Sequence, residues 1–214
     1  MKYDCVIWDW NGTLLDDVSA SLRSVNDMLE RRGMAPIDYP RYRACIGVPI
    51  RRFYEQVFDL SREDYAALLQ EYNEGYVHYV NLDCGIAAGG RALLEQIQAT
   101  GARQIIVSSC EKNQLEAAVK RYGVEQYFDA VLGADNFLAD SKVERAVRYL
   151  ADTYPGTLPR LIAVGDLVHD KDLARAVGAD CVLIQSGHED GARLRESGAL
   201  LARDVADAAR YILK

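Results

Sequence analysis

The chain has 214 residues, of which 50% are hydrophobic and 27% are charged, and its formal net charge is −7 at pH 7. This length accommodates one large domain, or a medium-sized core with a small accessory domain. The negative charge and the lack of Lys/Arg runs disfavour nucleic acid and anionic membrane surfaces as partners, and no apolar stretch reaches the roughly 18 residues of a membrane span.

Five short runs rich in Val and Ile follow one another along the chain, with segments of helical period between most of them. This alternation predicts an α/β fold with a Rossmann-like core, in which helices cover both faces of a parallel sheet. Ligands bind such sheets beyond the C-terminal ends of the strands, so polar residues that follow each strand are the first candidates for chemistry. The expected strands span residues 3–8, 104–107, 130–132, 161–164 and 181–184.

The interval between the first and second expected strands is far longer than a crossover helix needs. It holds roughly ninety residues, and from residue 16 to 83 the apolar and aromatic side chains recur at helical spacing with no convincing strand. Leu22, Val25 and Met28, for example, share one helix face. We predict a small helical domain at residues 16–84, inserted into an α/β core of residues 1–15 and 85–214.

Polar residues stand at the expected strand and helix ends. Asp9 leaves the first strand before Trp10-Asn11-Gly12-Thr13, and Ser108-Ser109 follow the second strand. Lys142 begins a later helix, where the helix dipole slightly disfavours a cation, and Asp166 and Asp170 follow the fourth strand. Each feature alone has an ordinary structural explanation, such as a turn, a helix cap or a solvated lysine.

Together and in this order, these motifs resemble those of the haloacid dehalogenase-like hydrolases. That family has Asp-x-Asp-Gly-Thr after the first strand, then a Ser or Thr, a Lys, and a Gly-Asp with a second acid four residues later. The matching positions are Asp9, Ser108, Lys142, Asp166 and Asp170. The inserted segment is similar to the helical cap of the phosphoglycolate-phosphatase-like branch.

The resemblance implies a hydrolase that uses Mg²⁺ and acts on a small phosphorylated substrate. Asp9 would be the nucleophile and form an aspartyl-phosphate. The metal ligands would be Asp9, the backbone carbonyl of Asn11 and Asp166, with Asp170 binding directly or holding the site together. Ser108, Ser109 and Lys142 would bind the phosphoryl oxygens, and Lys142 would also compensate the charge on Asp9.

Asn11 departs from the family pattern, because its place in the phosphatases is held by an Asp that acts as general acid and base. An amide cannot donate that proton, and general acid–base catalysis is typically worth about 10²–10⁴ in rate. We therefore expect Asn11 at the catalytic site of a phosphatase that is slow on poor leaving groups, and we expect Asn11→Asp to raise the alkyl-phosphate rate. The alternatives are a phosphate- and metal-binding regulatory protein with little turnover and, less favoured because Asp166 and Asp170 are retained, a dehalogenase-type hydrolase.

Arginines within the inserted segment are candidates for substrate recognition. Arg41, Arg43, Arg51 and Arg52 surround Gly47-Val48-Pro49, and we single out Arg51 as a substrate-binding residue, although an ordinary solvated arginine is an equally good explanation.

The N-terminal segment and the cysteines bear on the cellular location. A short apolar run reaches Asp9 at once, which is unlike a signal peptide, and the five cysteines are odd in number and form no C-x-x-C motif. We therefore expect free thiols in a cytoplasmic protein. The sequence leaves the oligomeric state open.

Overall fold

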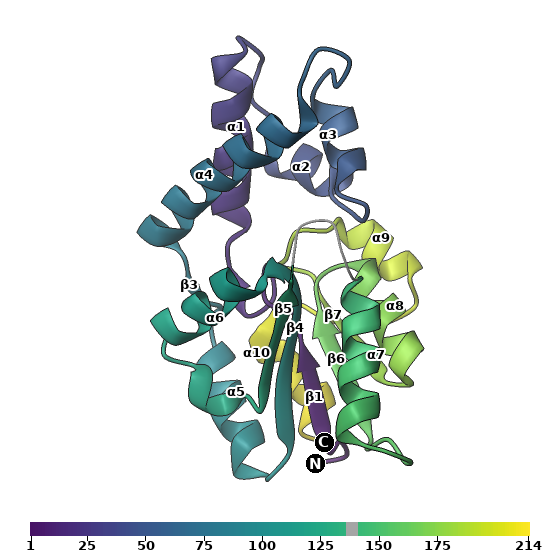
Figure 1. Cartoon of the computed structure of the whole chain (residues 1–214). Coiled ribbons are helices and arrows are strands. Elements are labelled where there is room, and N and C mark those ends of the chain that lie inside the picture. The colour runs from purple at the N-terminus through teal and green to yellow at the C-terminus, as the bar shows by residue number, and fades with distance from the viewer. Residues whose placement is uncertain (136–140) are drawn as a thin grey trace.

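The centre of the molecule is a six-stranded parallel sheet. The computed structural model describes residues 1–135 and 141–214, and its large sheet has the strand order β5-β4-β1-β6-β7-β8 (Figure 1). The Asp9 strand β1 is central, with β4 and β6 as its parallel neighbours. The predicted α/β class is therefore confirmed. The strands are β1 Cys5–Trp8, β4 Arg103–Glu111, β5 Ala130–Ala134, β6 Leu161–Gly165, β7 Asp180–Ile184 and β8 Leu200–Ala202.

Helices cover both faces of this sheet because the central strands are apolar on both sides. In β1, Val6 and Trp8 belong to one buried cluster, whereas Cys5 and Ile7 belong to another on the opposite face. The first cluster includes residues of α5 Gly90–Ala99, α6 Lys112–Arg121 and α10 Val205–Ile212; the second includes residues of α7 Lys142–Thr153 and α8 Val168–Val177. The short helix α9 Gly191–Glu196 and the 3-10 turn Glu125–Tyr127 complete this part of the chain.

Within the large sheet, β4 and β8 differ most from the sequence-based expectation. Strand β4 continues past residue 107 to Glu111, but its pairing with β5 shifts register between Val107 and Glu111. Ser108 therefore lies in an irregular stretch of strand and not after its end. Strand β8 was not predicted, because three residues are too short a run to show a period; pairing with β7 is what makes it a strand.

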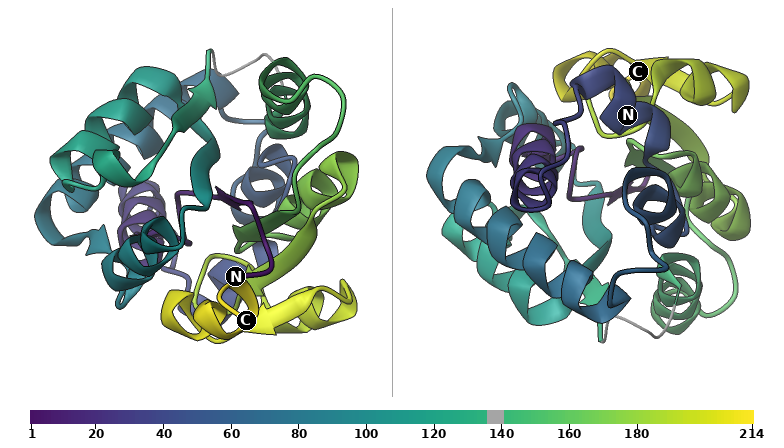
Figure 2. Two further views of the ribbon diagram at one scale, coloured as in Figure 1. Left: turned by 90° about the horizontal axis from the view of Figure 1, so that it is seen from below. Right: turned by 90° about the horizontal axis from the view of Figure 1, so that it is seen from above.

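Four helices form a separate layer beyond the C-terminal edge of the sheet (Figures 1 and 2). They are α1 Val18–Arg31, α2 Tyr39–Cys45, α3 Arg51–Val57 and α4 Tyr65–Asp83. We call them the helical unit. It has its own buried cluster, which contains Val25, Met28, Phe53 and Leu68.

The helical unit is joined to the rest of the chain by a pair of short strands. Strand β2 Leu15–Asp16 precedes the unit, β3 Gly85–Ile86 follows it, and the two pair in antiparallel fashion. Both connections therefore run side by side into the edge of the sheet where β1 ends. Across the described ranges 1–135 and 141–214, every helix is too short or too polar to cross a lipid bilayer.

Candidate active site

Three buried carboxylates meet at the C-terminal edge of the sheet. Asp9 follows β1, Asp166 follows β6, and Asp170 lies in the first turn of α8. Because β1 and β6 are adjacent and parallel, both ends reach the same point. Each of the three residues offers a carboxylate oxygen, and these oxygens lie within 4.8 Å of one another. The structure thus brings together three of the predicted metal-binding residues, and the group could hold a metal ion.

Lys142 lies inside this acid group. It is the first residue of α7 and is only 6% exposed. Its Nζ contacts Asp9 Oδ1 and lies 2.5 Å from Asp170 Oδ1. Burial acts to lower the pKa of Lys142, but the charges of Asp170 and Asp9 and their hydrogen bonds raise it above the ordinary value. The ammonium group therefore stays charged and offsets two of the three carboxylates.

Asp170 also shapes the loop between β6 and α8. Its Oδ2 accepts hydrogen bonds from the backbone N–H groups of Asp166, at 3.1 Å, and Leu167, at 3.0 Å. Since Oδ1 is held by Lys142, both oxygens of Asp170 already have partners.

The other two acids are destabilised as anions in this environment. Burial raises the pKa of Asp9 to about 6; Lys142 opposes the shift and Asp170 adds to it. Burial also raises the pKa of Asp166 well above its usual value, with His188 acting against the shift and Asp9 adding to it. A cation between Asp9 and Asp166 would relieve their repulsion.

The backbone packs closely around Asp166. Gly12 has a φ of +68°, and a Cβ at this position would lie 2.3 Å from Asp166 Oδ2. The Asn-Gly turn after Asp9 is therefore required both by its left-handed conformation and by the space that Asp166 occupies. Thr13 Oγ1 completes the contact, at 3.5 Å from both Asp9 Oδ2 and Asp166 Oδ1.

Asn11 points into a hydrogen-bond network with residues that the sequence reasoning did not select. Its Nδ2 donates to Asp17 Oδ2 at 2.8 Å and lies 2.6 Å from the hydroxyl of Tyr76 in α4. Asp17 is 1% exposed, and its Oδ1 accepts from the backbone N–H of Gly12 at 2.6 Å.

His188 joins the acid group to this network. It follows β7, and its backbone N–H donates to Asp166 Oδ2 at 2.6 Å. Its ring lies between Asp17, with Nε2 3.1 Å from Oδ1, and the Tyr42 hydroxyl, 2.8 Å from Nδ1. Burial acts to lower the pKa of His188, but Asp17, Asp166 and Asp9 raise it to about 9. The rule that polar residues after strands are candidates would have found His188 if applied to β7.

The predicted substrate-binding residues are spread more widely. Ser108 is buried in β4, where its Oγ accepts from the backbone N–H of Cys110 at 3.1 Å, while Ser109 is exposed. Arg51 pairs with Glu55 at 3.0 Å, lies over the Tyr65 ring, and has a side chain that is 57% exposed. The structure does not bring Arg51 to the acid group, so its role in substrate binding stays a prediction that these contacts do not support.

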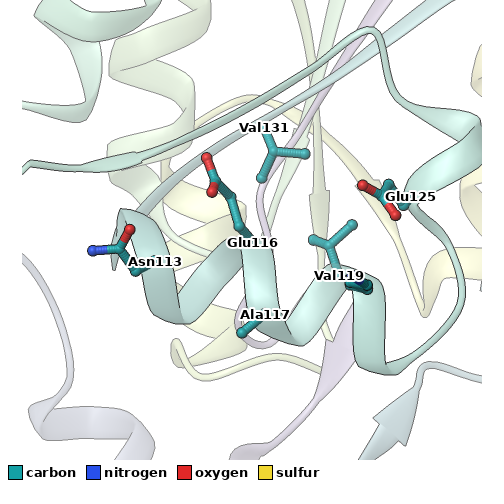
Figure 3. Close-up of a pocket in the computed structure, with 7 residues that line it drawn as sticks. Asn113, Glu116, Ala117, Val119, Glu125 and Val131 are labelled. Carbon is teal, nitrogen blue, oxygen red and sulfur yellow. The ribbon is translucent and has the colours of Figure 1, made fainter.

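A surface cavity on the core does not coincide with the acid group. It has a volume of about 300 Å³ and lies beside α6 (Figure 3). None of Asp9, Lys142, Asp166 and Asp170 lines it. Its lining residues are Asn113, Glu116, Ala117, Val119, Lys120, Glu125 and Val131.

Comparison with known families places this geometry in context. The model of a family described as haloacid dehalogenase-like hydrolase matches residues 6–184, which is most of the chain. The matched range includes the three carboxylates of the acid group and Lys142. The chain belongs to the haloacid dehalogenase-like hydrolases. The resemblance that the strand-end motifs suggested is confirmed at the level of the family.

Individual relatives of this hydrolase cover most of its length. It is 24% identical over 190 residues to phosphoglycolate phosphatase of Caulobacter vibrioides, an alignment that covers 86% of this chain and 80% of the relative. It is 28% identical over 195 residues to tyrosine-protein kinase PtkA of Mycobacterium tuberculosis, with 86% and 62% covered. A solved haloacid dehalogenase-like protein from Streptococcus pneumoniae shares the fold, with a TM-score of 0.81, 18% identity and 99% coverage of both chains.

Proposed function

We propose that this hydrolase is a magnesium-dependent phosphatase that acts on a small phosphorylated metabolite through an aspartyl-phosphate on Asp9. The observation that carries the proposal is the buried group of Asp9, Asp166 and Asp170 with Lys142 in contact with the first and the last. A carboxylate nucleophile beside a cation and further carboxylates suits phosphoryl transfer. The likeness to a phosphoglycolate phosphatase supports the same class of reaction.

The donor set fits a hard divalent cation. Carboxylate and carbonyl oxygens are the ligands that Mg²⁺ prefers. Asp9 and Asp166 offer carboxylate oxygens here, and the backbone carbonyl of Asn11 would add the ligand that the family resemblance implies. Because both oxygens of Asp170 are engaged by Lys142 and by backbone N–H groups, we assign Asp170 to holding the site and not to direct ligation. When bound, Mg²⁺ would offset the repulsion between a phosphate dianion and the Asp9 carboxylate.

The two chemical steps use one oxygen of Asp9. Lys142 contacts Oδ1, which leaves Oδ2 to attack phosphorus. The new bond joins Oδ2 to phosphorus while the bond to the leaving oxygen breaks. The leaving group departs with the electron pair and takes up a proton from solvent water. Water then attacks the phosphorus of the aspartyl-phosphate, and orthophosphate and free Asp9 result. Ser108, Ser109 and Lys142 would hold the phosphoryl oxygens.

The helical unit would act as the cap of this site, with residues 16–84 as its limits. It lies over the edge of the sheet where β1 and β6 end (Figure 1). Tyr76 contacts Asn11, and Tyr42 contacts His188. Substrate choice would therefore depend on this unit.

A binding protein with little turnover is the second candidate function. The observation that favours it is Asn11, whose amide nitrogen donates to Asp17 and has no acidic proton for a leaving group. Such a protein would bind Mg²⁺ and phosphate at the same residues. A dehalogenase-type reaction is less favoured, because the buried acids Asp166 and Asp170 are both present.

The two functions are separated by hydrolysis assays with and without Mg²⁺. We expect the protein to release phosphate from members of a panel of phosphorylated metabolites and from p-nitrophenyl phosphate, only with Mg²⁺. Asp9→Asn should eliminate this activity and leave the thermal melt cooperative, because every turnover passes through Asp9. The matched control is Asp16→Asn, since Asp16 is exposed.

Activity that survives in Asp9→Asn would belong to another site or to a contaminant, and the phosphatase proposal would then fail. Phosphate binding without hydrolysis across the whole panel would favour the binding protein.

A further inference from the structure

Asp17 lies at the start of a helix, but its side chain does not cap that helix. It is the N-cap residue of α1, the position where an Asp side chain usually accepts from the first backbone N–H groups, yet its side chain makes no capping hydrogen bond. The carboxylate is instead buried, 1% exposed, and directed at the turn that follows Asp9. Helix capping therefore does not explain why the Asp17 carboxylate is buried among polar partners.

The four polar partners of Asp17 divide between its two oxygens. Oδ1 accepts from the backbone N–H of Gly12 at 2.6 Å and faces His188 Nε2 at 3.1 Å. Oδ2 accepts from Asn11 Nδ2 at 2.8 Å and from the Tyr76 hydroxyl at 2.6 Å. The Gly12 contact involves the backbone, so it determines which oxygen faces the turn and which faces Asn11.

This division makes an amide at position 11 the matching partner of a carboxylate at position 17. An Asp at position 11 would place an acceptor against the acceptor Oδ2, with both groups negatively charged, Asp17 buried and position 11 half-buried. The amide nitrogen gives a charge-assisted hydrogen bond in its place. Because Nδ2 faces Asp17 and Tyr76, the amide oxygen of Asn11 is turned away from them and stays free of this network.

We propose that Asp17 is a positioning residue for Asn11: it holds the amide by its nitrogen and thereby sets the orientation of the side chain two residues after the nucleophile. Tyr76 contacts both Asn11 and Asp17, so the orientation also depends on where α4 lies over the site. The proposal deepens the proposed phosphatase function and rests on it for its effect on catalysis.

The proposal changes the result expected for Asn11→Asp. Sequence reasoning alone predicts a gain in the alkyl-phosphate rate, because an acid is restored. With Asp17 Oδ2 at hydrogen-bond distance from the position 11 side chain, the single substitution sets two carboxylates against each other. We therefore expect the gain only when Asp17 is changed as well.

The test is a reciprocal exchange of the two residues. In Asp17→Asn, the backbone N–H of Gly12 still donates to the side-chain oxygen of residue 17. The side-chain nitrogen of residue 17 then faces Asn11 Nδ2, so two donors oppose each other. In Asn11→Asp, two acceptors oppose each other. In the double variant Asn11→Asp/Asp17→Asn, the residue 17 nitrogen donates to the residue 11 carboxylate, and the hydrogen bond is restored with its direction reversed.

Two readouts are measured on the wild type and the three variants. In thermal melts, each single variant should unfold at a lower temperature than the wild type, and the double variant should recover most of the loss. In steady-state hydrolysis of an alkyl phosphate and p-nitrophenyl phosphate with saturating Mg²⁺, kcat should fall in each single variant with a much smaller change in KM. The double variant should exceed Asn11→Asp in kcat by at least about tenfold on the alkyl phosphate. Asp16→Asn is the matched control, with melt and kinetics like those of the wild type.

Additive effects of the two substitutions in both readouts would overturn the proposal, as would an Asn11→Asp variant as active and as stable as the double variant. If the wild type hydrolyses nothing, the phosphatase proposal fails on its own, and the melts still decide the pairing. Recovery in the double variant then supports the Asn11–Asp17 partnership, and additivity rejects it.

Discussion

Asp166 and Asp170 lie four positions apart in the chain but differ in their surroundings. Asp170 has both oxygens occupied, by Lys142 and by two backbone N–H groups. Asp166 Oδ2 accepts from the backbone N–H of His188, and its Oδ1 has a long contact with Thr13. Burial is the main cause that raises the pKa of Asp166 well above its usual value, and the nearby charge of Asp9 adds to the shift. Asp166 is therefore the acid that gains most from a bound cation.

Removing Asp166 should eliminate the response of the protein to Mg²⁺. We expect wild-type melting to shift upward with Mg²⁺, since a ligand at one hundred times its Kd stabilises by about 2.7 kcal/mol. In Asp166→Ala the shift should vanish, because one of the two acids at adjacent strand ends is gone. Differential scanning fluorimetry with EDTA or Mg²⁺ measures this. Asp172→Ala is the control, since Asp172 is half exposed and its side chain pairs with Arg175 on the same helix. A full shift in Asp166→Ala would place the metal elsewhere.

Helices α1 and α4 cross closely at Gly75. A Cβ on Gly75 would lie 2.6 Å from Ser24 Oγ and 3.3 Å from Ser24 Cβ, and Ser24 Oγ donates to the backbone oxygen of Tyr72. The next residue, Tyr76, is the one that contacts Asn11 and Asp17. The packing of this helix pair therefore sets the position of a hydroxyl group at the candidate site.

A larger residue at this crossing should loosen the helical unit. We expect Gly75→Val to lower the free energy of unfolding by about 1–3 kcal/mol, the usual effect of overpacking, and to reduce kcat by displacing Tyr76. Urea unfolding and steady-state kinetics measure the two effects. Ala67→Val tests the β-branched residue alone, because Ala67 is exposed on the same helix. If both variants lose the same stability and the same kcat, the close approach of the helices at Gly75 does not explain these losses.

At the scale of the molecule, arginines add to the contacts between the helical unit and the core near the loop that carries His188. Arg43 Nη2 donates to the backbone oxygen of Ser186 at 2.8 Å, and Arg193 Nη1 in α9 donates to the backbone oxygen of Ile46 at 2.5 Å. Arg193 also pairs with Glu189, whose Oε2 accepts from the N–H of Val168 at the start of α8. This contact holds the end of α2 against the loop that carries His188.

Weakening this contact should let the helical unit move away from the site. For Arg193→Ala we expect KM to rise about fivefold, which corresponds to about 1 kcal/mol for a lost charged hydrogen bond, with little change in global stability. Limited proteolysis should also cut the connecting strands faster. Arg195→Ala is the control, from an exposed arginine on the same helix. Unchanged KM and proteolysis would mean that the remaining contacts, among them the β2–β3 pairing and the Tyr42–His188 contact, hold the unit in place without Arg193.

The sequence by itself was enough to predict the α/β core, the family and the four residues that meet at its edge. Buried parallel strands are continuous apolar runs, and residues that follow adjacent strands must meet at one edge. Asp9 and Asp166 could therefore be placed at the same edge of the sheet, and the family resemblance implied that they meet there. The start of α7 at Lys142 could be predicted from the preceding residue, since Ser141 is of a type favoured at the N-cap.

Only the tertiary structure decided what surrounds Asn11. The surrounding residues come from a helix N-cap, two helices and a loop, and no periodic pattern links side chains that far apart in the chain. They are Asp17, Tyr42, Tyr76 and His188. Asp17 precedes a helix and is of a residue type common at N-caps, and the sequence does not distinguish that local preference from burial against a distant partner. Arg51 looked like a ligand for the same reason, yet its partner is Glu55 one turn along its own helix. Which polar side chain faces the site depends on how the helical unit packs on the sheet, and that packing is determined by contacts between distant segments.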